Sequence, residues 1–249
     1  MEMNINFKNI KLKNIHHFKF LCYLMILALY ATFGNVIEAK ANIYTNGKNS
    51  ANKLIMLDPG HGGVDGGAVG NSGILEKHFN LSISTKLKQQ LEAKGFKVVM
   101  TRDEDKGLYE NNGTIRKKKN EDLSNRCKLK ESSKCNMFIS IHMNMFPQTQ
   151  YYGPQVWYSK NLQSKRLAHI IQKSMVEDLH DKSNRVEKPA LDSYKILRCV
   201  DDIPSVIIEC GFLSNPTEEA KLRDDKYQTK VAESITRSII EFYSSNESN

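Results

Sequence analysis

Four residues of this chain have types that together could bind a metal ion and catalyse hydrolysis. His61 lies in LDPGHGG, Glu76 at the start of an expected helix, and His142 in FISIHMN. Two imidazoles and one carboxylate suit zinc, and three protein ligands leave the fourth position of the ion for water. Glu209, in SVIIECGFLSN, is a further carboxylate that could take a proton from this water. If the four side chains converge in space, they predict a zinc hydrolase.

Each of these residues also has an ordinary structural explanation. His61 could simply be exposed in the turn after Pro59, and Glu76 could interact favourably with the amino-terminal end of its helix. His142 and Glu209 are more informative, because both adjoin strongly apolar runs, where a polar side chain needs a partner. Burial would raise the pKa of Glu209 toward the range of a proton shuttle, and a nearby cation would oppose that rise.

Several glycines and two further polar residues surround these candidates. The span from residue 60 to 73 is rich in glycine, which would let a ligand loop wrap closely around an ion. A phosphate-binding loop would require the pattern G-x-x-x-x-G-K-[ST], which the sequence lacks. Arg102 and Asn144 are second-rank candidates for contacts with a substrate or for orienting other groups.

Short apolar runs alternate with helical patterns from residue 53 onward. Apolar side chains recur at helical spacing in 79–91, 167–179 and 227–242. The alternation predicts a single α/β domain whose twisted, mostly parallel sheet of about six strands is flanked by helices on both faces. Functional groups of such sheets gather at the carboxyl ends of the strands, which is where His61, His142 and Glu209 lie. The runs typical of strands are Lys53–Asp58, Phe96–Thr101, Met137–His142, Gln155–Ser159, Tyr194–Arg198 and Ser205–Glu209.

Two segments outside these runs, 103–122 and 1–41, have distinctive compositions. Residues 103–122 are charged and show no period, so we expect a long loop at the rim of the site, with the basic stretch 116–119 in solvent. Residues 1–41 join lysines to an apolar run and an A-x-A pattern, which is typical of a signal peptide or of an N-terminal membrane anchor. Whether this leader is cleaved stays open. In either case we expect an extracytoplasmic protein, with membrane contact through the leader if it is retained. A linker (42–52), the catalytic domain (53–244) and a C-terminal tail (245–249) would follow.

The net charge and the spacing of the cysteines indicate which binding partners and which kind of metal site to expect. The formal net charge of +8 suits attraction to an anionic wall or membrane surface, and no nucleic-acid-binding module is visible. The four cysteines beyond the leader show no C-x-x-C spacing, so a cysteine-based zinc site is not expected. Export permits disulfides, but their pairing stays open. Cys210 is expected to be a buried thiol. The four are Cys127, Cys135, Cys199 and Cys210.

Five segments in order resemble the zinc-dependent N-acetylmuramoyl-L-alanine amidases, the amidase-3 family of cell-wall hydrolases. They are LIMLDPGHGGVDGGA, ILEKHFNLSIS, FKVVMTR, FISIHMN and SVIIECGFLSN, and the resemblance covers about residues 53–244. It implies that zinc is bound by His61, Glu76 and His142, and that Glu209 is the catalytic glutamate. It also implies an α/β fold and hydrolysis of the amide bond between N-acetylmuramic acid and L-alanine in peptidoglycan.

Some features depart from a typical member of this family. The connection 144–154 leaves little room for the autoinhibitory helical insertion that some members carry after the histidine strand, and no glycan-binding repeat flanks the domain. Small members without such modules resemble the sporulation amidase of endospore formers, which prepares the spore cortex for muramic-lactam formation. The protein would then act in the intermembrane space of the forespore, and a partner protein could activate or deliver it.

Two alternatives to this function remain. The chain could be a catalytically inactive peptidoglycan-binding or regulatory protein on the same fold, although the presence of all four key residues argues against this. It could also be a zinc carboxypeptidase or another peptidase with similar ligands, and the identity of the cleaved bond would distinguish the two enzymes.

Overall fold

The computed structural model describes residues 52–179 and 182–245, which belong to one compact unit, Gly47–Asn249. The expected leader (1–41) lies outside the described residues, as do nearly all of the linker and the tail, so these boundaries stay predictions. Within the described part of the chain, no helix combines the length and the apolar character that crossing a membrane would require.

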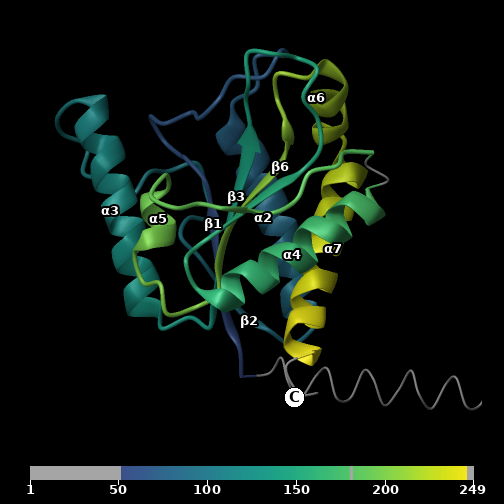
Figure 1. Cartoon of the computed structure of the whole chain (residues 1–249). Coiled ribbons are helices and arrows are strands. Elements are labelled where there is room, and N and C mark those ends of the chain that lie inside the picture. Colours follow the sequence, from purple (N-terminus) through teal and green to yellow (C-terminus); the bar gives the residue numbers. More distant parts are fainter. Residues whose placement is uncertain (1–51, 180–181, 246–249) are drawn as a thin grey trace, which may run out of the picture. The chain divides into compact units, whose positions relative to one another are not determined.

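A single mixed sheet forms the centre of the described unit (Figure 1). Its strand order is β2-β1-β3-β6-β4-β5. The first four strands in this order run parallel, whereas β4 is antiparallel to β6 and β5 runs parallel to β4. The predicted mostly parallel sheet is therefore confirmed. The strands are β1 (Leu54–Pro59), β2 (Lys97–Met100), β3 (Met137–Asn144), β4 (Gln155–Tyr158), β5 (Lys188–Pro189) and β6 (Ser205–Phe212).

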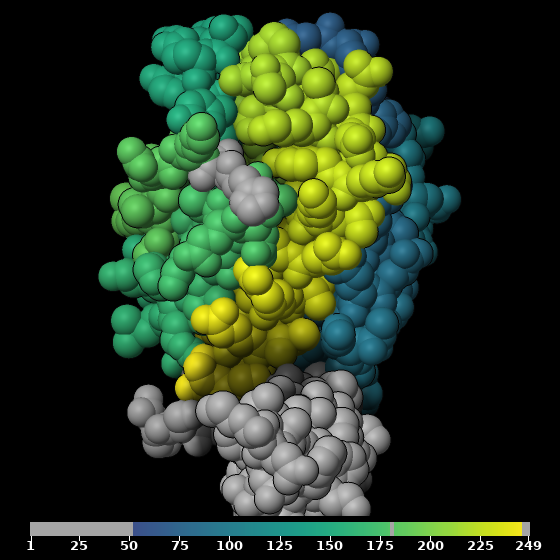
Figure 2. All heavy atoms as spheres, turned by 90° about the vertical axis from the view of Figure 1, so that its right-hand side faces the viewer, coloured from purple at the N-terminus to yellow at the C-terminus, as the bar shows by residue number. Residues whose placement is uncertain are grey.

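Helices cover both faces of the sheet, as expected. The larger core lies under α2 (Glu76–Ala93), α4 (Leu162–Asp178) and α7 (Asp225–Ser244). Figure 2 shows α7 between α4 and α2 on this side of the molecule. The smaller core lies on the other face, under α3 (Ile115–Ser133) and the single turn α5 (Lys195–Arg198). The short helix α6 (Pro216–Leu222) follows β6.

Alternation along the strands divides the side chains between the two cores. Ile139 on β3 and Ile208 on β6 are buried in the larger core, whereas Phe138 and Ile207 are buried in the smaller one. On β1, β3 and β6 the same alternation places Asp58, His142 and Glu209 near the carboxyl ends, on the face that α3 and α5 cover.

Tyr194–Arg198 was expected to be a strand, and this prediction is wrong, because the segment forms the helical turn α5. Ile196 and Leu197 are adjacent in sequence and are both buried in the smaller core. A helical turn allows this, whereas a strand would direct the two side chains to opposite faces.

The expected loop 103–122 is also partly wrong, because α3 begins at Ile115 and so includes the basic stretch 116–119. Thr114 caps this helix by accepting a hydrogen bond from the backbone amide of Lys117. The helix has no apolar stripe, since the side chains that it buries fully are Arg126 and Lys130. A search for apolar periodicity could not detect it.

Candidate metal centre and active site

The first candidate ligand lies in the turn that follows β1. His61 adopts a left-handed conformation, with φ of 60°, directly after Gly60. Asp65 accepts a hydrogen bond from His61 Nδ1 at 2.8 Å, which leaves Nε2 free to face Glu76, at 3.2 Å from Oε2. A carboxylate behind a histidine in this way fixes the tautomer and the ring orientation that a metal ligand needs.

Glu76, the first residue of α2, joins the two histidines. Its Oε2 accepts from the amide of Ala68 at 2.9 Å, and its Oε1 accepts from the amide of Met143 at 3.1 Å. Oε1 also lies 3.0 Å from His142 Nδ1. Burial alone would raise the pKa of Glu76, but the hydrogen bonds with His142 and His61 outweigh it and hold this pKa well below its usual range. The carboxylate is therefore ionised at neutral pH.

His142 and Glu209 are direct neighbours on adjacent strands, since they are paired in register between β3 and β6. Both side chains lie on the face of the sheet that α3 and α5 cover, because each falls on the alternation of the smaller core. Gly60 makes room for the imidazole, as a Cβ on this glycine would overlap the His142 ring.

The three candidate ligands lie close together, which is the condition that the sequence analysis set for a metal site. One potential ligand atom from each of His61, Glu76 and His142 lies within 4.8 Å of the others. Burial alone would lower the pKa of His61, but its contacts with Asp65 and Glu76 raise the pKa to about 9. The carboxylates thus favour positive charge at the point where the three side chains meet, and a divalent cation would supply it.

Glu209 completes the cluster. It is 8% exposed, and its Oε2 has no hydrogen-bond partner among the residues that the structure describes. Burial, opposed by the neighbouring histidines and reinforced by Glu76, raises the pKa of Glu209 to about 7. A buried carboxylate oxygen without a partner is unfavourable by itself, so this atom fits a role toward a ligand. Two imidazoles, one ionised carboxylate and this spare oxygen fit a zinc site with a general base.

A buried polar network beneath the turn was not foreseen from the sequence. Arg126 on α3 forms an ion pair with Asp58 of β1 at 2.5 Å and donates to the carbonyl oxygens of Pro59 and His61. It therefore holds the backbone that carries His61. Asp58 could have been recognised as a buried charge from the sequence, because it follows an apolar run. Arg126 could not, because it lies in a helix with many other charged residues.

Arg102 is buried and, among the described residues, donates its hydrogen bonds to backbone carbonyl oxygens. It is 1% exposed, and its guanidinium donates to the carbonyl oxygens of Pro59, Gly60, Lys77 and Glu104 at 2.9–3.0 Å. These contacts fit the orienting role, one of the two that the sequence suggested, because they anchor the ligand turn and the start of α2. A contact of Arg102 with substrate stays a prediction.

Asn144 lies two residues beyond His142, at the end of β3, where its carbonyl oxygen accepts from the amide of Leu213 at 2.8 Å. Its role toward a substrate stays a prediction.

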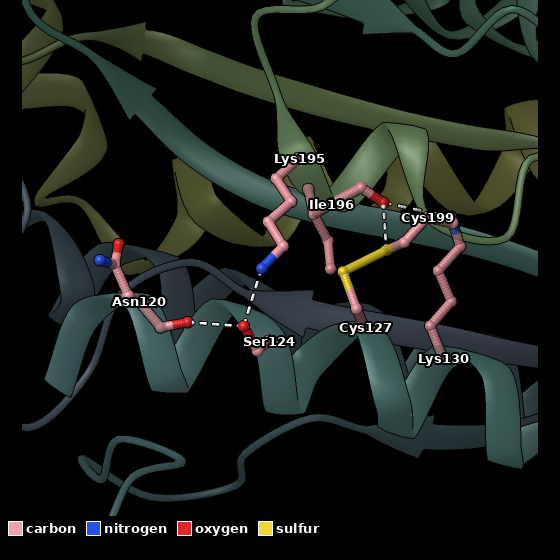
Figure 3. The surroundings of a disulfide bond; sticks show 7 residues. All are labelled: Asn120, Ser124, Cys127, Lys130, Lys195, Ile196 and Cys199. Carbon is pink, nitrogen blue, oxygen red and sulfur yellow. Dashed lines mark hydrogen bonds between the residues drawn. A yellow bond between two sulfur atoms is a disulfide. The ribbon is translucent and has the colours of Figure 1, made fainter. Parts of the chain in front are cut away.

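The cysteine pairing that the sequence left open is decided by the structure. Cys127 on α3 forms a disulfide with Cys199, at the end of α5 (Figure 3). Cys135 and Cys210 are free and buried, in agreement with the expectation for Cys210.

Known proteins share both the sequence and the fold. Residues 55–241 match the family model of N-acetylmuramoyl-L-alanine amidase. The germination-specific N-acetylmuramoyl-L-alanine amidase of Bacillus subtilis (strain 168) is 37% identical over 193 residues, which make up 77% of this chain and 80% of that protein.

Two solved structures give the same result. The CwlD amidase from Clostridioides difficile, solved in complex with the GerS lipoprotein, is 43% identical, with a TM-score of 0.75 over 78% of this chain and 100% of that chain. The catalytic domain of CwlV, an N-acetylmuramoyl-L-alanine amidase from Bacillus (Paenibacillus) polymyxa var. colistinus, is 31% identical, with a TM-score of 0.65 over 76% of this chain and 97% of that chain. The family match spans most of the chain and includes every strand that bears a candidate ligand, so the chain belongs to the N-acetylmuramoyl-L-alanine amidase family.

Proposed function

We propose that this protein is a zinc-dependent hydrolase of the amide bond between N-acetylmuramic acid and L-alanine in peptidoglycan. The observation that carries this proposal is the convergence of His61, Glu76 and His142, with the unpartnered oxygen of Glu209 beside them. Family membership supplies the class of bond.

The donor set favours zinc as the metal. Two histidine nitrogens and one carboxylate oxygen form a typical catalytic zinc site, and hard cations such as Mg²⁺ prefer oxygen ligands. His61 and His142 would bind the ion through one nitrogen each, and Glu76 would bind it through its carboxylate. Asp65 would keep the His61 ring in the required orientation.

The chain's own residues then account for the movement of protons. When bound, zinc polarises a carbonyl group and lowers the pKa of water. Glu209 takes a proton from the attacking water and returns it to the amine of L-alanine as the amide bond breaks. Its raised pKa, about 7 in the protein alone, suits a group that accepts and releases a proton near neutral pH. The products are a free stem peptide and a lactyl carboxylate on the sugar.

We further propose a role in endospore formation, at the spore cortex before muramic-lactam formation. The similarity to a germination-specific amidase supports this role. The substrate implies a location outside the cytoplasm, and the proposed role in endospore formation would place the protein in the intermembrane space of the forespore. A partner protein that activates or delivers the enzyme is part of the proposal, and the GerS complex of the similar CwlD amidase supports it.

The test is to digest purified peptidoglycan with protein of measured zinc content and to identify the released fragments by mass spectrometry. Intact stem peptides that begin with L-alanine are the expected products. Release of single C-terminal residues would indicate a carboxypeptidase instead. Retention on the glycan without release of peptide would indicate an inactive binding protein.

A further inference from the structure

The segment between β5 and β6 packs on the same face of the sheet as the catalytic cluster. Tyr194 precedes α5, is half-buried, and stacks on Trp157 of β4 with ring centroids 5.7 Å apart. Trp157 pairs in register with Ile207 of β6, and both contribute to the smaller core. Glu209 lies two residues beyond Ile207 and therefore on the same face. Tyr194 thus lies next to the row of side chains that leads to Glu209.

Burial and the neighbouring carboxylates affect the protonation of the Tyr194 phenol. Burial, together with the negative charges of Glu209 and Glu76, raises the pKa of Tyr194 to about 12. The phenol therefore keeps its proton at neutral pH and can donate it in a hydrogen bond. The hydroxyl forms no hydrogen bond with residues 52–179 or 182–245, so the donor is available to a ligand.

Four bonds, one disulfide and three hydrogen bonds, hold the segment that carries Tyr194. The disulfide between Cys127 and Cys199 links the end of α5 to α3, and Lys130 donates to the carbonyl oxygens of Ile196 and Cys199 at 3.2 and 2.8 Å (Figure 3). Lys195, the next residue after Tyr194, donates to the hydroxyl of Ser124 at 2.7 Å. We call this set of bonds the α3–α5 clamp.

The turn α5 depends on the clamp for its place on the sheet. A helix this short has little stability of its own, so its place on the sheet depends on the bonds to α3 and on the burial of Ile196 and Leu197. The disulfide closes a loop with a sequence separation of 72 residues, which restricts the unfolded chain and favours the native placement of α5. The position of the Tyr194 hydroxyl is therefore set by α3 as well as by α5.

We propose that Tyr194 is a substrate-contacting residue, that its hydroxyl donates a hydrogen bond to an oxygen of the bound muramoyl peptide, and that the α3–α5 clamp positions it. This inference rests on the proposed amidase function and adds a substrate-binding residue to the metal ligands and Glu209. The hydroxyl would supply a neutral donor on the face of the sheet that α3 and α5 cover.

The first experiment compares Tyr194→Phe with Tyr243→Phe in the full chain, loaded with zinc, on a soluble muramoyl peptide. Tyr243 is the matched control, because its buried hydroxyl likewise has no partner among the described residues and its ring packs on Phe96, near the amino end of β2. We expect kcat/KM of Tyr194→Phe to fall about tenfold, the size of one lost hydrogen bond, while zinc content and Tm match the wild type. Tyr243→Phe should keep the wild-type kcat/KM. A kcat/KM of Tyr194→Phe within twofold of the wild type would overturn the proposal.

The second experiment tests the clamp with the double variant Cys127→Ser/Cys199→Ser, which avoids reductants that chelate zinc. Removing the disulfide should lower kcat/KM when Tyr194 is present. It should not lower kcat/KM further when Tyr194→Phe is already present, because the two changes remove the same contact. Fully additive losses would show that the clamp does not act through Tyr194. Cys135→Ala, at a free buried thiol, is the control. A wild-type protein without amidase activity would instead contradict the proposed function, so the two failures are distinguishable.

Discussion

The proposed role of Glu209 as a general base depends on the burial of its carboxylate and on its neighbours. Glu209 lies on a buried strand beside His142, and burial raises its pKa to about 7 while one of its oxygens has no hydrogen-bond partner among the described residues. An ordinary structural glutamate would be paired or exposed. The cluster therefore combines one carboxylate that is held ionised, Glu76, with one that can exchange a proton.

Glu209→Gln should abolish turnover and leave the metal bound. The amide preserves the shape of the side chain but cannot accept a proton from water, so we expect kcat to fall at least about 100-fold, in line with the loss of a general base. Zinc content, measured by atomic emission, should equal that of the wild type, and Tm should not fall, because a buried ionisable group has been made neutral. Cleavage of purified peptidoglycan at a near wild-type rate would show that the role assignment is wrong.

His142→Ala should reduce the zinc content of the purified protein. Two remaining ligands bind zinc much more weakly than three, so dialysis against a metal-free buffer should remove the ion from the variant but not from the wild type. His169→Ala is the matched control, since this histidine lies on α4 with its side chain 65% exposed. Unchanged metal stoichiometry in His142→Ala would argue against His142 as a ligand.

Elements of secondary structure bring the ligands together from distant parts of the chain. The carboxyl ends of β1, β3 and β6 are neighbours in the sheet, and the start of α2 returns to them through the glycine-rich turn. The approach of β1 to β3 is close enough that the His142 ring lies against the backbone of Gly60. The site therefore depends on the backbone of the turn as much as on the ligand side chains.

Gly60→Ala should disturb the site although it changes no ligand. The added methyl group would overlap the His142 ring, so the ring or the turn must shift. We expect weaker zinc retention and a loss of about 1–3 kcal/mol in the free energy of unfolding, as for other overpacked positions. Gly73→Ala is the control, because its Cβ would meet nothing within 4 Å and only its positive φ is unfavourable. Equal zinc retention in the two variants would contradict this account.

At the scale of the whole molecule, a buried ion pair joins the sheet to α3. Burial alone would raise the pKa of Asp58, but the charge of Arg126 and the hydroxyls of Thr101 and Ser140 outweigh it and bring the pKa to about 2. The folded pKa lies below the usual value of 3.8, so the pair stabilises the folded state above about pH 4, and the stabilisation is lost as the pH falls toward 2.

Urea unfolding at several pH values between 7 and 2.5 measures this contribution. The wild type should lose about 2 kcal/mol of unfolding free energy through Asp58 over this range. Asp58→Asn should be less stable than the wild type at pH 7, because Arg126 would remain buried without its partner. The variant should also show a flatter dependence on pH, and curves of equal slope for the two proteins would exclude Asp58 as the source.

The class of fold, and the residues proposed for the site, could be predicted from local patterns in the sequence. A histidine or glutamate at the end of an apolar run is a local pattern that can be read from the sequence. Functional residues of parallel sheets lie at the carboxyl ends of the strands, and this rule predicted that His61, His142 and Glu209 lie near one another. The three helices with apolar stripes were also predictable, because each buries one face against the larger core.

Which charged residues are buried could not be predicted from the sequence and depends on how the elements pack. Arg102, Arg126 and Lys130 lie in segments that look solvated, yet each is buried because its donors reach carbonyl oxygens or carboxylates that belong to other elements. The disulfide and the helical turn α5 depend in the same way on where α3 packs. Hydrogen bonds and disulfides between elements join residues that are far apart in the sequence, so they produce no periodic pattern in it. Burial of one apolar face of a helix or strand does produce such a pattern.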